Sequence, residues 1–413
     1  ESEPEPSPEP EPEPAPEPEP EPEPEPNPYS ISNIEQTYSL NLIHTFEDIQ
    51  ISDWENNDDR VRFSNDSSII AIPDNESTKV YSFNTSTNTI TLTSTLTRET
   101  VSPALNTSRW AEFSEEFANI AMNGDGNIIV TSAEDTNNSN KTSIFVYKNI
   151  NGTWTQYGDW YMNGVEKNSG EYLTLSDLGF TPNLTRVRLD ISEDGTTIII
   201  GSGNDPGYRV RVFKYDSSTD RWDENHDGGA GTTGLGGGTG SSWYGYRNQG
   251  NQVVINKDGT ITAHSCISHN YAIQVYMYSG TGTTWYQIGV FNPDKSTYTE
   301  WVPYGLDMNS DGTIIAFKGL KETTSYGYPS GIGHAEVWKY SGDLLSNYSD
   351  GNMGNQTGTI NSGNWTQLGS NWDLPHRSPH YFYSMSIDST GYVVSFQDDS
   401  IHFLKEWDKD KKM

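Results

Sequence analysis

Two short segments of the chain hold the side chains best suited to metal chemistry. In the first, His264, Cys266 and His269 lie close together in the sequence TAHSCISHN. His264 and Cys266 share one face of a strand, but His269 does not unless the chain bends. A zinc site needs a fourth ligand and a closed geometry, which this spacing does not supply. We therefore expect a structural role for these residues.

The second segment, residues 223–227, offers several oxygen ligands in the sequence DENHD. Oxygen-rich loops bind calcium, so Asp223, Glu224 and Asp227 are the candidate metal ligands. The segment leads directly into the glycine-rich stretch 228–240, which favours a solvated loop over an ordered site. That stretch lacks the Gly-Lys-Ser/Thr ending of a phosphate-binding loop. We expect no cofactor, and calcium is the one alternative.

A recurring hairpin pattern must position these residues. An apolar run, Asp-Gly or a close substitute, and a second apolar run recur six times at intervals of roughly sixty residues. Glycine tolerates a positive φ and aspartate can bond its own backbone, so the pair suits a tight turn. The aspartates are therefore expected to be turn residues, not catalytic or calcium-binding groups. They are Asp66, Asp125, Asp194, Asp258, Asp311 and Asp388.

The first and last copies of the hairpin lack a glycine directly after the aspartate. Ser67 follows Asp66 in the first copy, and Ser389 follows Asp388 in the last, where Gly391 comes later. Terminal repeats are often atypical. We expect looser turns in these two copies.

Each hairpin is followed by signals for two further strands. Third strands are predicted at 79–83, 143–148, 209–215, 272–278, 334–340 and 400–407. Fourth strands are indicated by Trp-x-Gln-x-Gly at Trp154, Trp285 and Trp365, with a degenerate copy at Trp222. Four strands per repeat is the pattern of a β-propeller blade.

The sequence therefore predicts an all-β chain with a single β-propeller of six four-stranded blades at residues 29–413. The sixth copy ends near Trp407 without a fourth strand. Residues 37–46 could pair in that last blade, which would close the ring and remove two exposed sheet edges. Seven blades are the alternative if 85–116 contains a degenerate copy.

The N-terminal segment 1–28 differs from the rest of the chain. It holds thirteen prolines and eleven glutamates in near-strict alternation, and such a segment can form neither a core nor a ladder. We expect an extended, polyproline-II-like tail that acts as a spacer, or as a stalk that docks on a partner.

The net charge of the chain is −32, of which the glutamates of the tail account for eleven. Nucleic acid is an unfavourable partner for a surface of this sign. A single cysteine excludes an internal disulfide framework, and no transmembrane run is expected. The many Asn-x-Ser/Thr sequons favour a glycosylated chain that is secreted or displayed on a cell or virion. They are Asn65, Asn75, Asn84, Asn106, Asn137, Asn140, Asn151, Asn183, Asn347, Asn355 and Asn364.

Together, the motifs Asn/Ser-x-Asp-Gly-x-Ile-Ile-Ala, Val-x-Val-Tyr and Trp-x-Gln-x-Gly resemble the repeats of TolB and WD-repeat-like propellers. They are also similar to FG-GAP-type extracellular propellers of protists, algae and their large viruses. The likeness covers 37–407 and implies a binding or scaffolding module. No copy carries the Asp-x-Asp-x-Asp-Gly loop of calcium-binding repeats, so the resemblance implies no calcium site.

We therefore expect a non-enzymatic extracellular module, a propeller head on an acidic stalk used in surface or filament assembly. Its partners would be proteins of that assembly, including copies of itself through residues 1–28, or glycans. The chain has no Gly-x-Ser-x-Gly elbow and no His-Glu-x-x-His motif. The alternative is a glycan-acting hydrolase or lyase whose carboxylates come from different blades. Aromatic residues anchor interfaces and stack on sugars, so the binding candidates are Trp243, Tyr244, Tyr246, Tyr326 and Tyr328.

Overall fold

The structure is a computed structural model of the 413-residue chain. It describes residues 61–74, 77–96, 120–135, 141–162, 165–166, 173–174, 177–178, 187–202, 210–225, 249–266, 272–278, 280, 282, 285–291, 300–322, 332–341, 365–368, 372–374, 385–387, 393–397 and 401–405. All of them belong to the unit Leu42–Met413. They contain no helix long and apolar enough to cross a lipid bilayer.

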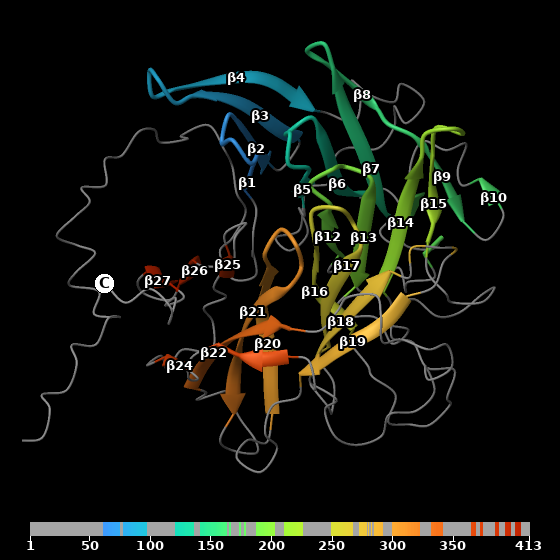
Figure 1. Cartoon of the computed structure of the whole chain (residues 1–413). Coiled ribbons are helices and arrows are strands. Elements are labelled where there is room, and N and C mark those ends of the chain that lie inside the picture. The colour runs from blue at the N-terminus through green and yellow to red at the C-terminus, as the bar shows by residue number, and fades with distance from the viewer. Residues whose placement is uncertain are drawn as a thin grey trace, which may run out of the picture. The chain divides into compact units, whose positions relative to one another are not determined.

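The described residues form six sheets in chain order, built almost entirely from antiparallel strands (Figure 1). The first sheet consists of β1 (Arg62–Phe63), β2 (Ile69–Asp74), β3 (Ser77–Asn84) and β4 (Thr89–Leu96). The second contains β5 (Ile120–Met122), β6 (Ile128–Asp135), β7 (Lys141–Ile150), β8 (Thr153–Gln156) and β11 (Leu173–Thr174). The third contains β12 (Val187–Ile191), β13 (Thr197–Ser202), β14 (Val210–Asp216), β15 (Arg221–Glu224), β9 (Asp159–Met162) and β10 (Val165–Glu166).

The next two sheets keep the same order of strands, and the last has fewer described strands. The fourth consists of β16 (Gln249–Ile255), β17 (Ile261–Cys266), β18 (Ala272–Tyr278) and β19 (Trp285–Phe291). The fifth contains β20 (Glu300–Met308), β21 (Ile314–Glu322), β22 (Ile332–Tyr340), β23 (Trp365–Gln367) and β24 (Trp372–Leu374). The sixth shows β25 (Met385–Ile387), β26 (Val393–Gln397) and β27 (Ile401–Lys405).

The third sheet shows how a strand packs against a neighbouring sheet on each of its two faces. Successive side chains of a strand point to opposite faces of its sheet. Ile198 and Ile200 of β13 join a core with residues of the second sheet, whereas Ile199 joins a core with Val253 of the fourth. All three isoleucines are fully buried. A continuous apolar run in the second strand therefore reflects a sheet that lies between two others.

Similar cores join the other neighbouring sheets. One cluster joins the first and second sheets through Val80 and Phe145, and another joins the fourth and fifth through Val275 and Phe317. Ile387 of the sixth sheet packs with residues of the fifth. Six sheets packed in sequence through their faces make a β-propeller-like all-β fold.

The turns between the first and second strands, here called the Asp turns, have one geometry in the first five sheets. They are residues 64–68, 123–127, 192–196, 256–260 and 309–313. In the third sheet, Gly195 has a φ of 72°, and its N–H donates a hydrogen bond to Ser192 O at 2.9 Å. The same glycine conformation recurs at Gly126, Gly259 and Gly312.

The first Asp turn corrects one of our expectations. Ser67 adopts a φ of 59°, and its N–H donates a hydrogen bond to Ser64 O at 2.8 Å. Ser64 N also bonds Ile69 O at 3.0 Å, as in the other hairpins. The prediction of a looser first turn is wrong, because the serine accepts the left-handed conformation that glycine takes elsewhere. The turn after Ile387 lies outside the described residues.

The predicted fourth strands are confirmed as β8, β15, β19 and β23. Residues 85–96, the start of the stretch 85–116, form the turn after β3 and the strand β4, which pairs with β3 in the first sheet. This part of the chain is therefore no extra blade, and its remainder lies outside the described residues. The tail 1–28 and the proposed closing strand 37–46 also lie outside them.

Candidate functional site

The aspartates of the Asp turns are bound within their own turns. Asp194 Oδ1 accepts hydrogen bonds from Thr196 N at 2.9 Å and from Thr196 Oγ1 at 2.8 Å. The hydroxyl of Ser64 and the backbone of Ser68 donate to Asp66, and these bonds lower its pKa from 3.8 to about 2. The expected turn role of the aspartates is confirmed by bonds of this kind at Asp66, Asp194, Asp258 and Asp311.

A serine or asparagine two residues before each aspartate completes the turn. Asn256 Oδ1 accepts hydrogen bonds from Thr260 N at 2.9 Å and from Ile261 N at 2.8 Å. Ser192 Oγ accepts from the equivalent amides of Thr196 and Thr197. The other side chains in this position also accept backbone hydrogen bonds, namely Ser64, Asn123 and Asn309.

The Asp turns of successive sheets are joined by backbone hydrogen bonds. These bonds connect each turn to the next, so the five turns form one continuous series. They run from Asn65 N to Gly124 O (2.8 Å), from Gly124 N to Glu193 O (2.9 Å), from Asp194 N to Lys257 O (2.9 Å) and from Lys257 N to Ser310 O (2.9 Å).

Glu193 connects turns that are not neighbours in this series. Its Oε2 accepts a hydrogen bond from Asn65 Nδ2 in the first turn at 2.8 Å. Its Oε1 accepts one from Ser310 Oγ in the fifth turn. Since Glu193 itself lies in the third turn, its half-buried carboxylate holds the first, third and fifth turns together. No local pattern predicts this role, because Glu193 occupies the variable position of the motif, between Ser192 and Asp194.

Two further carboxylates, which the hairpin motif did not predict, join neighbouring sheets. Asp190 Oδ2 accepts a hydrogen bond from Ile255 N of the fourth sheet at 2.9 Å. Asp307 Oδ2 accepts the equivalent bond from Ile387 N of the sixth sheet at 2.8 Å. Both stand four residues before the turn aspartate, so an alignment of the copies shows an extra aspartate in the third and fifth repeats.

The Trp-x-Gln-x-Gly motif also joins neighbouring sheets. Trp222 of the third sheet donates its indole N–H to Tyr157 O, which follows β8 of the second sheet, at 2.8 Å. A Cβ on Gly158 would lie 2.9 Å from that indole, so the glycine makes room for it. Two other tryptophans donate the same bond to the preceding sheet at 2.9 Å, Trp285 to Asn225 O and Trp365 to Ile288 O.

His264 occupies a buried polar position in the fourth sheet. Its Nε2 lies 3.1 Å from Gln274 Oε1, which also accepts the hydroxyl of Tyr276 at 3.0 Å. The rings of His264 and Tyr276 stack with their centroids 5.5 Å apart. Burial lowers the pKa of His264 to about 4, so the imidazole is neutral at pH 7. His269 lies outside the described residues, as does the side chain of Cys266.

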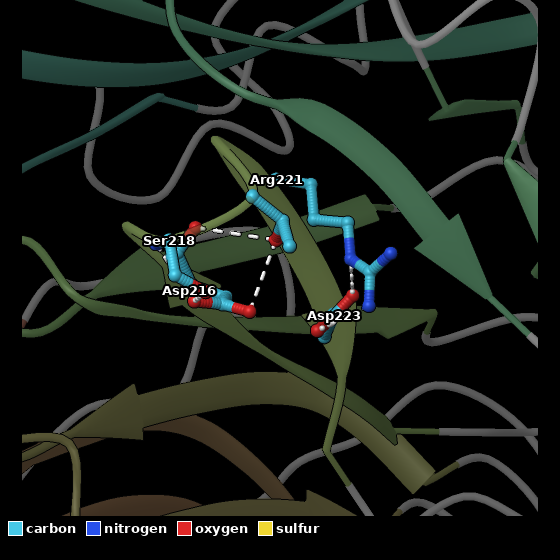
Figure 2. A network of polar contacts seen from close by, with 5 residues as sticks. Asp216, Ser218, Arg221 and Asp223 are labelled. Atoms are coloured by element: carbon cyan, nitrogen blue, oxygen red, sulfur yellow. Dashed lines mark hydrogen bonds and ion pairs between the residues drawn. The ribbon is translucent and has the colours of Figure 1, made fainter.

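The candidate calcium ligands Asp223 and Glu224 are paired with arginines. Figure 2 shows Asp223 against Arg221, whose Nε lies 2.6 Å from Asp223 Oδ1. The Arg211 Nη1 group donates to Glu224 Oε1 at 2.6 Å, and this pair is largely buried. In the same view Asp216 accepts the Ser218 hydroxyl at 2.7 Å, which holds the pKa of Asp216 below its usual value. Asp227 lies outside the described residues.

The remaining predicted site residues fall into two groups. Three sequon asparagines, Asn65, Asn84 and Asn151, lie in exposed turns of the first two sheets. The other eight sequons lie outside the described residues, and so do all five aromatic binding candidates, Trp243, Tyr244, Tyr246, Tyr326 and Tyr328. Within the described ranges, no three His, Cys, Asp or Glu side chains are grouped as a metal site.

Comparisons with known proteins name no family. No family model matches the chain, and no curated protein matches it. Among solved structures, hydrazine synthase of Kuenenia stuttgartiensis is similar with a TM-score of 0.47, at 11% identity over 88% of this chain and 80% of that one. TolB of Acinetobacter baumannii has a TM-score of 0.33, at 13% identity over 68% of this chain and 51% of that one.

The GH74 enzyme of Niastella koreensis is also similar, with a TM-score of 0.42 at 14% identity. The match covers 84% of this chain and 41% of that one. Similarities of this size carry no argument about activity.

Proposed function

We propose that the chain is a non-enzymatic extracellular scaffold, a six-bladed propeller head on the acidic stalk 1–28, used in surface or filament assembly. The observation that carries this proposal is that the polar side chains between the sheets form hydrogen bonds with other parts of the same chain. Asp190 and Asp307 accept hydrogen bonds from neighbouring sheets, Glu193 accepts them from the first and fifth Asp turns, and the turn aspartates bond their own backbone. A glycan-acting enzyme would instead need carboxylates from different blades directed at a sugar.

In this proposal residues 37–46 complete the sixth sheet. The described part of that sheet has three strands, whereas each of the first five sheets has at least four. A strand from the N-terminal side would cover the open edge and join the two ends of the propeller in one blade. Closure of this kind removes edges on which other chains could pair.

In this proposal, contacts with other molecules are made by two aromatic segments and by the stalk. The aromatic candidates Trp243, Tyr244 and Tyr246 belong to the segment between β15 and β16, and Tyr326 and Tyr328 to that between β21 and β22. The stalk 1–28 makes the contact between copies of the chain. Secretion or surface display accounts for the number of sequons.

Charge determines how association through the stalk should depend on salt. Eleven of the 32 net negative charges lie in the stalk, which leaves −21 on the remainder. Copies of the chain therefore repel one another at low ionic strength. At about 0.15 M salt the screening length falls to about 8 Å, so association through the stalk should strengthen as salt is added.

The test is sedimentation velocity on unglycosylated protein produced in bacteria. Three forms are compared over a range of protein and NaCl concentrations: the full chain, a deletion of 1–28, and a full-length form with all eleven stalk glutamates changed to glutamine. We expect the full chain to associate at higher salt, the glutamine form to associate at lower salt, and the deletion to remain monomeric with an unchanged melting temperature. Equal association with and without residues 1–28, or a monomeric full chain throughout, would overturn the role of the stalk.

A further inference from the structure

Three sequons lie in described turns, and their side chains differ in what they bind. Asn84 and Asn151 lie at the turns between the third and fourth strands, here called the outer turns, of the first and second sheets. Asn65 lies in the first Asp turn. An N-linked glycan is attached to the side-chain amide nitrogen, Nδ2, so that atom must be reachable and must have space around it.

The Asn84 side chain uses its oxygen in the turn. Oδ1 accepts hydrogen bonds from Ser86 N at 3.0 Å and from Thr87 N at 3.1 Å. This arrangement orders the sequon Asn84-Thr85-Ser86 while the nitrogen has no hydrogen-bond partner among the described residues. Asn84 and the turn that follows it are exposed. Its Nδ2 is therefore available in a defined conformation.

Asn151 lies in an exposed turn that does not depend on its side chain. It is exposed and has a φ of 53° at the tip of the hairpin between β7 and β8. The turn is held by a bond from Gly152 N to Asn149 Oδ1 at 2.8 Å, so the Asn151 amide is not needed for it. A Cβ placed on Gly152 would meet no atom within 4 Å. The exposed Asn151 therefore lies beside open space on the Gly152 side of the turn.

Asn65 is exposed but its nitrogen is engaged. Nδ2 donates to Glu193 Oε2 at 2.8 Å, the bond that ties the first turn to the third. The same nitrogen lies 2.7 Å from the position that a Cβ on Gly124 would occupy, so it is packed against the second Asp turn. A sugar on this atom would displace the second turn or Glu193.

We propose that Asn84 and Asn151 carry N-linked glycans in the folded protein and that Asn65, with an equally complete sequon, does not. The proposal rests on the secretory route proposed above. It places two glycans on equivalent outer turns of neighbouring sheets, because the first and second sheets share one core. The Asp turns then stay free of sugar, and Asn65 keeps its structural bond.

The test is expression of the full chain in a eukaryotic secreting host behind a supplied signal peptide. The folded, monomeric fraction is isolated and treated with peptide N-glycosidase F, which converts each occupied asparagine to aspartate. Peptide mass spectrometry then reads the occupancy of each sequon. We expect conversion at Asn84 and Asn151 and none at Asn65.

Two variants provide matched controls, since each removes a sequon but leaves its asparagine in place. Ser86→Ala keeps the backbone N–H that bonds Asn84, and Thr153→Ala lies at an exposed position. Each should lose one glycan mass and leave the melting temperature of the enzyme-treated protein unchanged. Occupancy of Asn65 in the folded fraction, or an unmodified Asn84 or Asn151, would overturn the proposal. The sedimentation test uses unglycosylated protein, so either result can fail without the other.

Discussion

Asp190 and Asp307 illustrate how single residues act in this fold. Each carboxylate accepts a backbone N–H from the next sheet, at 2.9 and 2.8 Å respectively. Charge-assisted hydrogen bonds of this kind are stronger than neutral ones. The acidic residues of the described core thus contribute to cohesion between sheets, in addition to solubility.

His264 makes the stability of the protein depend on pH. In the folded chain its pKa is about 4, against the ordinary histidine value of 6.5, because burial disfavours the charged ring. Between these two values the unfolded chain binds more protons, so stability falls as the pH falls from 6.5 to 4. At about 1.4 kcal/mol per pH unit, the loss attributable to His264 approaches about 3 kcal/mol.

The matched variant is His264→Phe, because Phe317 holds the corresponding place in the fifth sheet. In urea unfolding at pH values from 4 to 7.5, the free energy of unfolding should depend less steeply on pH for this variant than for the wild type. Identical slopes in the two proteins would mean that His264 is not buried in a neutral form.

At the scale of elements, the Asp turns combine a conformational and a packing requirement. Gly259 has a φ of 68°, and a Cβ at this position would lie 2.1 Å from Thr197 Oγ1 of the preceding sheet. Gly152 of an outer turn has a φ of 88° but no neighbour within 4 Å of such a Cβ. The two glycines therefore separate the effect of conformation from that of close approach.

Changing each of these glycines to alanine tests that separation. Gly152→Ala should cost about 1–2 kcal/mol, the penalty of a left-handed residue. Gly259→Ala should cost roughly 2–5 kcal/mol, because overpacking adds about 1–3 kcal/mol. Chemical denaturation measures both, and equal losses would show that the Asp turns do not press against the preceding sheet.

The tryptophans of the fourth strands offer a second comparison between elements. Trp222 is fully buried and donates to Tyr157 O, whereas the buried indole N–H of Trp154 has no partner among the described residues. Trp222→Phe should therefore cost about 1 kcal/mol more than Trp154→Phe, the net value of one hydrogen bond. Thermal or urea unfolding gives the difference, which should vanish if the indole bonds contribute nothing.

The repeats made the strands predictable, but not the contacts between sheets. Aspartate-glycine turns and Trp-x-Gln-x-Gly strands have local causes, so their spacing indicated the hairpins and fourth strands. The bonds of Glu193 to Asn65 and Ser310 join residues 128 and 117 positions apart, and no local pattern encodes them. The left-handed Ser67 was also missed, because its neighbours in the structure, and not its residue type, determine its conformation.

The proposed function divides the whole molecule into a cohesive head and an acidic stalk. The head is held by the linked Asp turns, the cross-sheet carboxylates and the tryptophans. In the proposed function the stalk makes the contacts between copies. In the same proposal, residues 37–46 are the fourth strand of the sixth sheet.

Hydrogen exchange of the full monomeric chain is the direct test of this strand at 37–46. Amides in ladder hydrogen bonds exchange slowly, at rates set by local or global opening, whereas a solvated tail exchanges freely. We expect 37–46 to be protected to the same degree as β27, and the few amides of 1–28 to be unprotected. Exchange at 37–46 as fast as in the stalk would contradict the closed six-bladed scaffold.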